Sequence, residues 1–309
     1  MRGMLRKQCA SCFSLLMQTA LVGALWAVPL EARVTFVHDI HSRELFLGEQ
    51  HEEEWTSYTS GEMYTDRNKR YSGKWMRKLF GKEKEHRQTT HVCLEQGEIR
   101  QVDYERNRIV LYPLERIADV EWVEQKLGRD EQTQAMIQER YQVLEPQLQV
   151  LPLGERETLG GHWCRLVEST LRQETVDHRK DARSVTLIRQ KLWLADNIPG
   201  HETRLQFHER LASALGFESE RLGNLSFLLR HWKGPLDPIR HMLAHVQGFP
   251  VKSEITVEAR YTTGAGSQNP RTITRVIKEE TKVLREIHEG EFQGGSFELP
   301  SHFRVVVAR

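Results

Sequence analysis

Residues 251–261 alternate strictly between apolar or small side chains and polar ones, which is the pattern of a β-strand with one dry face and one wet face. Such a strand needs neighbours beside it and a cover over its dry face. Residues 33–112 read as several short strands, with plausible hairpin turns at 96–97 and 106–107, and residues 184–194 predict another strand. The sequence therefore predicts a large antiparallel sheet.

Apolar residues recur at helical spacing in two other regions. Residues 119–147 predict one long helix that ends near a proline, and residues 201–246 predict three short amphipathic helices in a row. These helices need a common apolar surface to cover, and the dry face of the predicted strands offers one. We therefore expect an α+β fold in which an antiparallel sheet curves around or beneath the helices.

The N-terminus has the layout of an export signal. Three basic residues lie within the first seven positions, and no charged residue occurs from position 8 to position 30. No clear cleavage site follows, so residues 1–32 are either a cleaved signal peptide or an uncleaved anchor. We expect residues 33–309 to form a single domain with a helical insert at 201–246, located in the periplasm or otherwise exported.

The balance of charge argues against nucleic acid as a partner. The chain has 44 basic and 43 acidic residues, and residues 33–309 alone are also close to neutral. Nucleic-acid binding normally needs a basic surface that displaces counterions from phosphates. No later stretch reads as a membrane span.

Two cysteines lie beyond the export signal, Cys93 and Cys164. In an oxidising compartment they could form a disulfide. The alternative is a pair of buried thiols that act as small apolar residues.

The stretch Tyr71 to Lys82, "YSGKWMRKLFGK", interleaves aromatic and basic residues in an otherwise balanced protein. Wound as a helix, it would present aromatic residues on one side and cations on the other, which suits an anionic lipid surface. The alternative is a hairpin whose aromatic residues tuck under the sheet while the lysines stay in water. The candidate membrane-surface residues are Lys74, Trp75, Arg77, Lys78 and Phe80.

Motifs for catalysis and for metal binding are weak. His241 and His245 have the spacing of one helical turn, but they face away from the apolar stripe and no third ligand stands at a recognisable spacing. There is no Gly-x-Ser-x-Gly elbow, no HExxH and no phosphate-binding glycine loop. The sequence therefore predicts a protein without catalytic residues, cofactor or metal.

Four short stretches carry a resemblance to a known group of proteins. "LEQGEIRQVDYERNRIVLYPLE" (94–115) resembles a segment of periplasmic lipoprotein-carrier (LolA and LolB-like) proteins. "GERETLGGHWCRLVE" (154–168), "KLWLADNIPG" (191–200) and "GSFELPSHFRVV" (295–306) resemble exported proteins of unknown function that share that fold. The resemblance implies a half-open antiparallel β-barrel with helices across its concave face, and an apolar cavity for acyl chains or hydrophobic protein segments.

These observations favour a non-catalytic protein of the cell envelope that binds a hydrophobic ligand, either a lipid or an acylated protein. The alternative is an interaction or scaffold protein with a filled core, in which the basic hairpin binds a membrane or a partner. The candidate ligand-binding residues are the apolar ones on the predicted strands and helices: Ile188, Leu192, Phe207, Leu211, Met242, Ile255, Val257 and Tyr261.

Overall fold

The computed structural model describes residues 33–71, 84–118, 139–215, 224, 246–264, 266–290 and 299–308. Strands dominate this part of the chain. In chain order the elements are β1 (Val34–Glu44), β2 (Gly48–Tyr58), β3 (Glu62–Tyr71), β4 (Lys84–Cys93), β5 (Glu98–Asp103), β6 (Arg108–Pro113), α3 (Leu114–Ala118), β7 (Tyr141–Val143), β8 (Gln147–Leu159), β9 (His162–Asp177), β10 (Ala182–Ala195), α6 (His201–Ala214), β11 (Phe249–Thr263), β12 (Arg271–Glu289) and β13 (Arg304–Val307).

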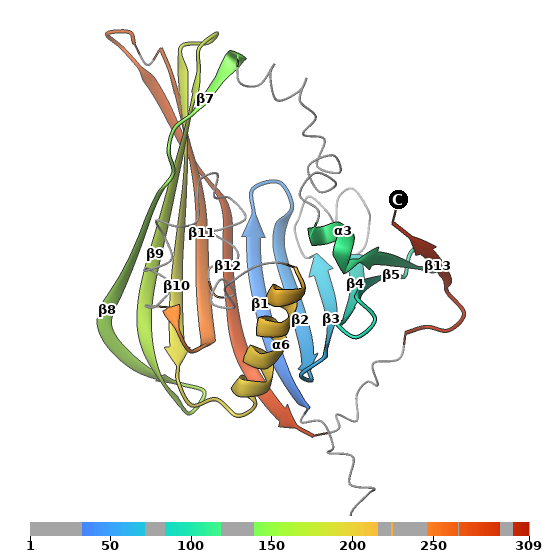
Figure 1. Cartoon of the computed structure of the whole chain (residues 1–309). Coiled ribbons are helices and arrows are strands. Elements are labelled where there is room, and N and C mark those ends of the chain that lie inside the picture. The colour runs from blue at the N-terminus through green and yellow to red at the C-terminus, as the bar shows by residue number, and fades with distance from the viewer. Residues whose placement is uncertain are drawn as a thin grey trace, which may run out of the picture. The chain divides into compact units, whose positions relative to one another are not determined.

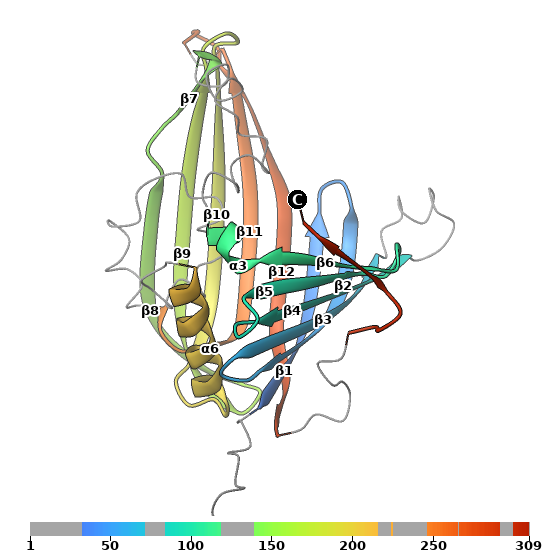
Figure 2. The same cartoon turned by 45° about the vertical axis from the view of Figure 1, so that its right-hand side comes forward.

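All of these strands belong to one 13-stranded sheet, as the sequence predicted for most of them. The order is β13-β6-β5-β4-β3-β2-β1-β12-β11-β10-β9-β7, with β8 also paired to β9. Only β13 and β6 pair in parallel among the described strands. No pairing joins β13 to β7 or β8 in these ranges, so the sheet is open, and it is curved (Figures 1 and 2).

The first and last long strands meet in the middle of the sheet. β1 pairs with β2 on one side and with β12 on the other, and Val34 lies opposite Glu289. This pairing joins the N-terminal meander β1 to β6 to the C-terminal strands β9 to β12. The turns predicted at residues 96–97 and 106–107 are confirmed, because Gly97 and Asn107 both have positive φ, at 63° and 47°.

The prediction of a helix over the whole of residues 119–147 is wrong at its C-terminal end. Tyr141–Val143 form the strand β7, and β8 begins at Gln147. Backbone pairing with β9 outweighs the helical spacing here, and the Arg140 guanidinium bonds Asp177 at 2.9 Å beside that edge. Residues 119–138 lie outside the described part of the chain.

Helix α6 confirms the first of the three short helices predicted within residues 201–246. Phe207 on its predicted apolar stripe is fully buried, and its ring lies 5.7 Å from that of Tyr58 on β2. Gly200 allows this approach, because it has φ 70° and an added Cβ atom would lie 2.2 Å from Val34 Cγ2. The other two helices lie outside the described residues.

Two clusters of buried side chains form the core. The first joins Phe36, Tyr58 and Phe249 of the strands to Phe207 of α6, and the ring centroids of Phe36 and Phe249 lie 4.6 Å apart. The second fills the space over β9, β10 and β11 with aliphatic residues such as Leu171. Aromatic packing of α6 against β1 and β2 therefore fixes the helix on one face of the sheet.

Candidate functional site

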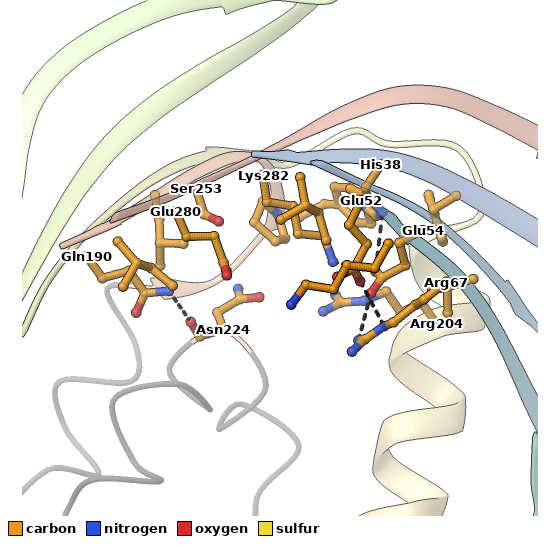
Figure 3. A pocket seen from close by; sticks show the side chains of 18 of the residues that line it. His38, Glu52, Glu54, Arg67, Gln190, Arg204, Asn224, Ser253, Glu280 and Lys282 are labelled. Atoms are coloured by element: carbon orange, nitrogen blue, oxygen red, sulfur yellow. Dashed lines mark hydrogen bonds and ion pairs between the residues drawn. The ribbon is translucent and has the colours of Figure 1, made fainter. Parts of the chain in front are cut away.

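A cavity of about 400 Å³ lies against the sheet on the face to which α6 packs. Its walls come from β1, β2, β3, β10, β11 and β12, from α6 and from Asn224 (Figure 3). Pockets for small molecules typically have volumes of about 300–1,000 Å³. We call this space, with the residues named below, the charged cavity.

The register of the sheet brings the polar lining together. Directly paired residues point to the same face, and Glu54 lies opposite His38 on β1 and opposite Arg67 on β3. On the other side of β1, Lys282 of β12 lies opposite Ser253 of β11. The lining is thus one continuous band of side chains across neighbouring strands.

Glu54 is the centre of the charged cavity. Only 4% of its side chain is exposed, and it accepts a hydrogen bond from Lys282 Nζ at 2.5 Å. Arg67 Nη2 lies 2.7 Å from the other carboxylate oxygen. Burial alone would raise the pKa of Glu54, but Lys282 and then Arg67 lower this pKa to about 2. The carboxylate is therefore ionised at neutral pH.

His38 lies beside this carboxylate and stays neutral. Burial, and then the charge of Lys282, lowers the pKa of His38 well below its usual value. Its Nδ1 atom lies 3.8 Å from Glu54 Oε1 and has no hydrogen-bond partner among the described residues. Burial raises the pKa of the neighbouring Glu52, and Arg67 opposes that rise.

Cations outnumber carboxylates around the cavity. Among the described lining residues, the five cations are Arg67, Lys69, Arg204, Lys278 and Lys282, and the three carboxylates are Glu52, Glu54 and Glu280. With His38 neutral, five positive charges against three negative ones leave an excess of two. Arg204 stands on α6 with its guanidinium 5.3 Å from the centre of the Phe249 ring.

One part of the wall is apolar. This part is lined by Phe36, Ile40, Leu192, Phe249, Pro250 and Ile255. At the end of the cavity away from Arg204, Gln190 donates from Nε2 to the carbonyl of Asn224 at 3.2 Å (Figure 3). Asn224 in turn donates to the carbonyls of Val246 and Gly248. The arrangement offers apolar contact and charged groups within one space, which suits binding of an amphiphilic molecule.

Of the predicted ligand-binding residues that the structure describes, two line this cavity, Leu192 and Ile255. Ile188 and Val257 lie in the second core cluster, and Phe207 lies in the first.

The remaining three candidates differ from one another in their surroundings. Leu211 is partly buried against the first core cluster. Tyr261, near the end of β11, is 38% exposed and does not line the cavity. Met242 lies outside the described residues.

The predicted membrane-surface residues Lys74, Trp75, Arg77, Lys78 and Phe80 also lie outside the described residues, as do His241 and His245. The structure does show where the flanking strands end. Tyr71 of β3 lies opposite both Gln50 of β2 and Lys84 of β4, at the same end of the sheet as the β1–β2 turn.

The candidate disulfide between Cys93 and Cys164 is not formed. Both residues are buried free thiols. Cys93 lies on β4 and Cys164 on β9, and six strands separate β4 from β9 in the sheet order. The alternative prediction of two buried thiols is the one that the structure supports.

The charged lining was missed from the sequence, although a signal for it exists. Glu52 and Glu54 are two positions apart on β2, and Lys278, Glu280 and Lys282 follow the same period on β12. Residues two apart share a face of a strand. Clusters of opposite charge at this spacing on two strands could have predicted a polar inner face.

The described ranges contain neither a metal-binding cluster nor a membrane-spanning helix. No group of three or more His, Cys, Asp or Glu side chains is arranged to hold a metal ion there. No helix in the same ranges is both long enough and apolar enough to cross a membrane.

Comparison of the chain with protein-family models gives no match, and comparison with curated proteins gives no significant match either.

Proposed function

We propose that this chain is an exported, non-catalytic binding protein of the cell envelope that holds a lipid or an acyl-bearing ligand in the charged cavity. The observation that carries the proposal is the cavity of about 400 Å³ with an apolar wall, seated on the inner face of a curved open sheet. In this proposal the sheet acts as a half-open β-barrel with helices across its concave face.

The apolar wall would supply the driving force for binding. Leu192 and Ile255, both at most 5% exposed, lie beside Phe36 and Phe249 in the lining. Removing apolar ligand surface from water against such a wall contributes about 25 cal/mol per Å². A cavity of this size holds part of an acyl chain or a compact amphiphile rather than a whole membrane lipid.

The experiment is native mass spectrometry of gently purified protein, followed by extraction and identification of bound lipids. We expect a mass above that of the polypeptide. The variant Ile255→Trp should fill the cavity and remove the extra mass, whereas Tyr261→Trp, on the same strand but outside the cavity, should retain it. A bare polypeptide mass for the unmodified protein under all purification conditions would overturn the proposal.

A second candidate is an interaction protein that binds a membrane or a partner through one end of the sheet. Three consecutive apolar residues stand exposed at the β1–β2 turn: Leu45, Phe46 and Leu47 are 42%, 76% and 36% exposed. The ends of β3 and β4 that flank the basic aromatic segment lie at this same end of the sheet.

Flotation with liposomes tests the second candidate. Phe46→Ser should weaken binding to anionic liposomes if the turn inserts into lipid, because it removes the most exposed apolar side chain. The double variant Trp75→Ser with Phe80→Ser tests the basic segment separately. Unchanged flotation in both variants would end this candidate.

A further inference from the structure

We infer that the charged cavity recognises an anionic group on its ligand, a carboxylate, phosphate or sulfate, through Arg204 and Lys69. This inference rests on the proposed function and specifies the ligand chemistry of the same site. It starts from the uneven pairing of the charges that line the cavity.

Three of the five cations already have carboxylate partners. Lys282 and Arg67 both bond the Glu54 carboxylate, at 2.5 and 2.7 Å. Lys278 Nζ lies 2.8 Å from Glu280 Oε2. Arg67 Nε also lies 3.6 Å from Glu52 Oε1, so the three carboxylates of the cavity are all paired with these three cations.

Arg204 and Lys69 are left over. Neither side chain forms an ion pair with a described carboxylate, although Glu52 lies directly opposite Lys69 in the β2–β3 register and feels its charge. Arg204 stacks over Phe249, and Lys69 Nζ lies 5.3 Å from the centre of the Tyr71 ring. Arg204 also forms a side-chain hydrogen bond with Tyr58. A guanidinium carries five N–H donors, so donors remain with which Arg204 can bind a carboxylate or phosphate.

A second observation at the same place also indicates a missing ligand. His38 is only 7% exposed and lines the cavity, and its Nδ1 atom has no hydrogen-bond partner among the described residues. At the other end of the cavity (Figure 3), Gln190, 4% exposed, has an Oε1 atom without a hydrogen-bond partner among the described residues. Buried polar atoms are normally satisfied, so these two atoms indicate that a polar group or water occupies the space before them.

Arg204 lies at the end of the cavity that holds Arg67 and Glu54, away from Gln190 (Figure 3). Arg204 rises from α6, on the opposite side of the cavity from the sheet, and Lys69 extends from β3. The apolar wall formed by Leu192 and Ile255 lies on β10 and β11. An amphiphile would place its anionic end toward α6 and β3 and its apolar body toward β10 and β11.

Two dyes with the same aromatic body test this inference directly. 1-Anilinonaphthalene-8-sulfonate carries a sulfonate, and N-phenyl-1-naphthylamine is the same molecule without it. We expect the unmodified protein to bind the sulfonated dye on the order of tenfold more tightly, because charged hydrogen bonds typically contribute enough for that difference. Fluorescence titration gives both affinities, and the variant Phe46→Ser removes dye binding at the exposed turn.

The variants Arg204→Gln and Lys69→Gln should each remove most of the preference for the sulfonated dye and leave the affinity for the neutral dye within about twofold. Arg210→Gln is the matched control, because Arg210 also stands on α6 but bonds Ser60 at 3.2 Å outside the cavity. The preference for the sulfonated dye over the neutral one is measured on the unmodified protein. The test therefore remains valid even if a variant fails to fold.

The outcomes separate the two proposals. Equal affinity of the unmodified protein for both dyes overturns the anion site and leaves the proposed function standing. Absence of binding of either dye overturns both. If dodecyl phosphate displaces the sulfonated dye and inorganic phosphate does not, the anionic group belongs to an amphiphile. If inorganic phosphate displaces the dye as well, the site binds a free anion. If neither compound displaces the dye, the inference is overturned.

Discussion

Glu54 and Lys282 form a hydrogen bond of 2.5 Å across strand β1, although 228 positions separate them in the chain. Glu54 stands on β2 and Lys282 on β12, the two strands that flank β1. The pair therefore joins the N-terminal and C-terminal parts of the sheet over their shared strand. The Glu54 side chain is 4% exposed and that of Lys282 is 31% exposed. Because the pair is largely buried, removing one partner leaves a poorly solvated charge and destabilises the fold.

The variant Glu54→Gln should lose about 3 kcal/mol of unfolding free energy at pH 7, because Lys282 and Arg67 would keep their charges without the carboxylate that they share. Urea unfolding measures this loss. Glu53→Gln is the control, since Glu53 is 41% exposed and its pair with Arg285 is worth less than about 1 kcal/mol. Equal losses in the two variants would show that Glu54 is not the centre of the cluster.

Alternation along single strands was sufficient to predict a large, mostly antiparallel sheet, but it could not assign the faces of every strand. On β11 the dry residues Ile255 and Val257 do face the interior, as predicted from residues 251–261. On β12 the interior face instead carries Lys278, Glu280 and Lys282. Glu54, the partner of Lys282, lies on a strand far away in sequence, and only the register of the folded sheet brings these two opposite charges together.

The same limit explains the two corrections. The spacing around Tyr141 fits a helix in isolation, and pairing with β9 outweighs it. Cys93 and Cys164 were candidates for a disulfide only because both lie beyond the export signal, whereas their separation depends on the sheet order. Local patterns predict elements well, and they carry little information about which elements become neighbours.

Acid should destabilise the protein in two steps, through histidines and then through Glu54. Burial first, and the charge of Arg204 second, lowers the pKa of His201 to about 4 and that of His208 to about 3. The unfolded chain takes up these protons near pH 6.5, so the stability from neutral histidines is complete above that pH and is lost as pH falls toward 4. Glu54, with a pKa of about 2 against an ordinary 4.5, contributes stability above pH 4.5 that is lost below it.

Urea midpoints between pH 7.5 and pH 4 measure the histidine step. His208 packs against Tyr58 and Phe207, with Arg204 and His201 as the charged or titratable groups beside it. In His208→Gln we expect a shallower fall of stability over this range, whatever its stability at pH 7.5. An identical pH dependence in the variant and the unmodified protein would contradict the assignment to His208.

Both cysteines should carry free thiols that react slowly. Burial raises the pKa of the Cys93 and Cys164 thiols, so little thiolate is present at neutral pH. Iodoacetamide should label neither residue readily in the folded protein and both after denaturation without reductant, as measured by peptide mass spectrometry. Recovery of a peptide pair linked by Cys93 and Cys164 would contradict the two free thiols.

Gly200 should be far less tolerant of substitution than other glycines with positive φ, because it sets the distance between α6 and β1. In Gly200→Ala the new methyl group would lie 2.2 Å from Val34 Cγ2, and a non-glycine residue at φ 70° is strained as well. We expect a loss of about 3 kcal/mol, by urea unfolding, together with weaker binding of the neutral naphthylamine dye as α6 moves from the cavity.

The matched control is Gly97→Ala, at φ 63° with nothing within 4 Å of the added Cβ atom. It carries the backbone strain without the clash, so about 1 kcal/mol should be lost and dye binding should be retained. The difference between the two variants isolates the contact of Gly200 with Val34. If Gly200→Ala cost no more than Gly97→Ala, the close approach of α6 to β1 would not be what holds this wall of the charged cavity in place.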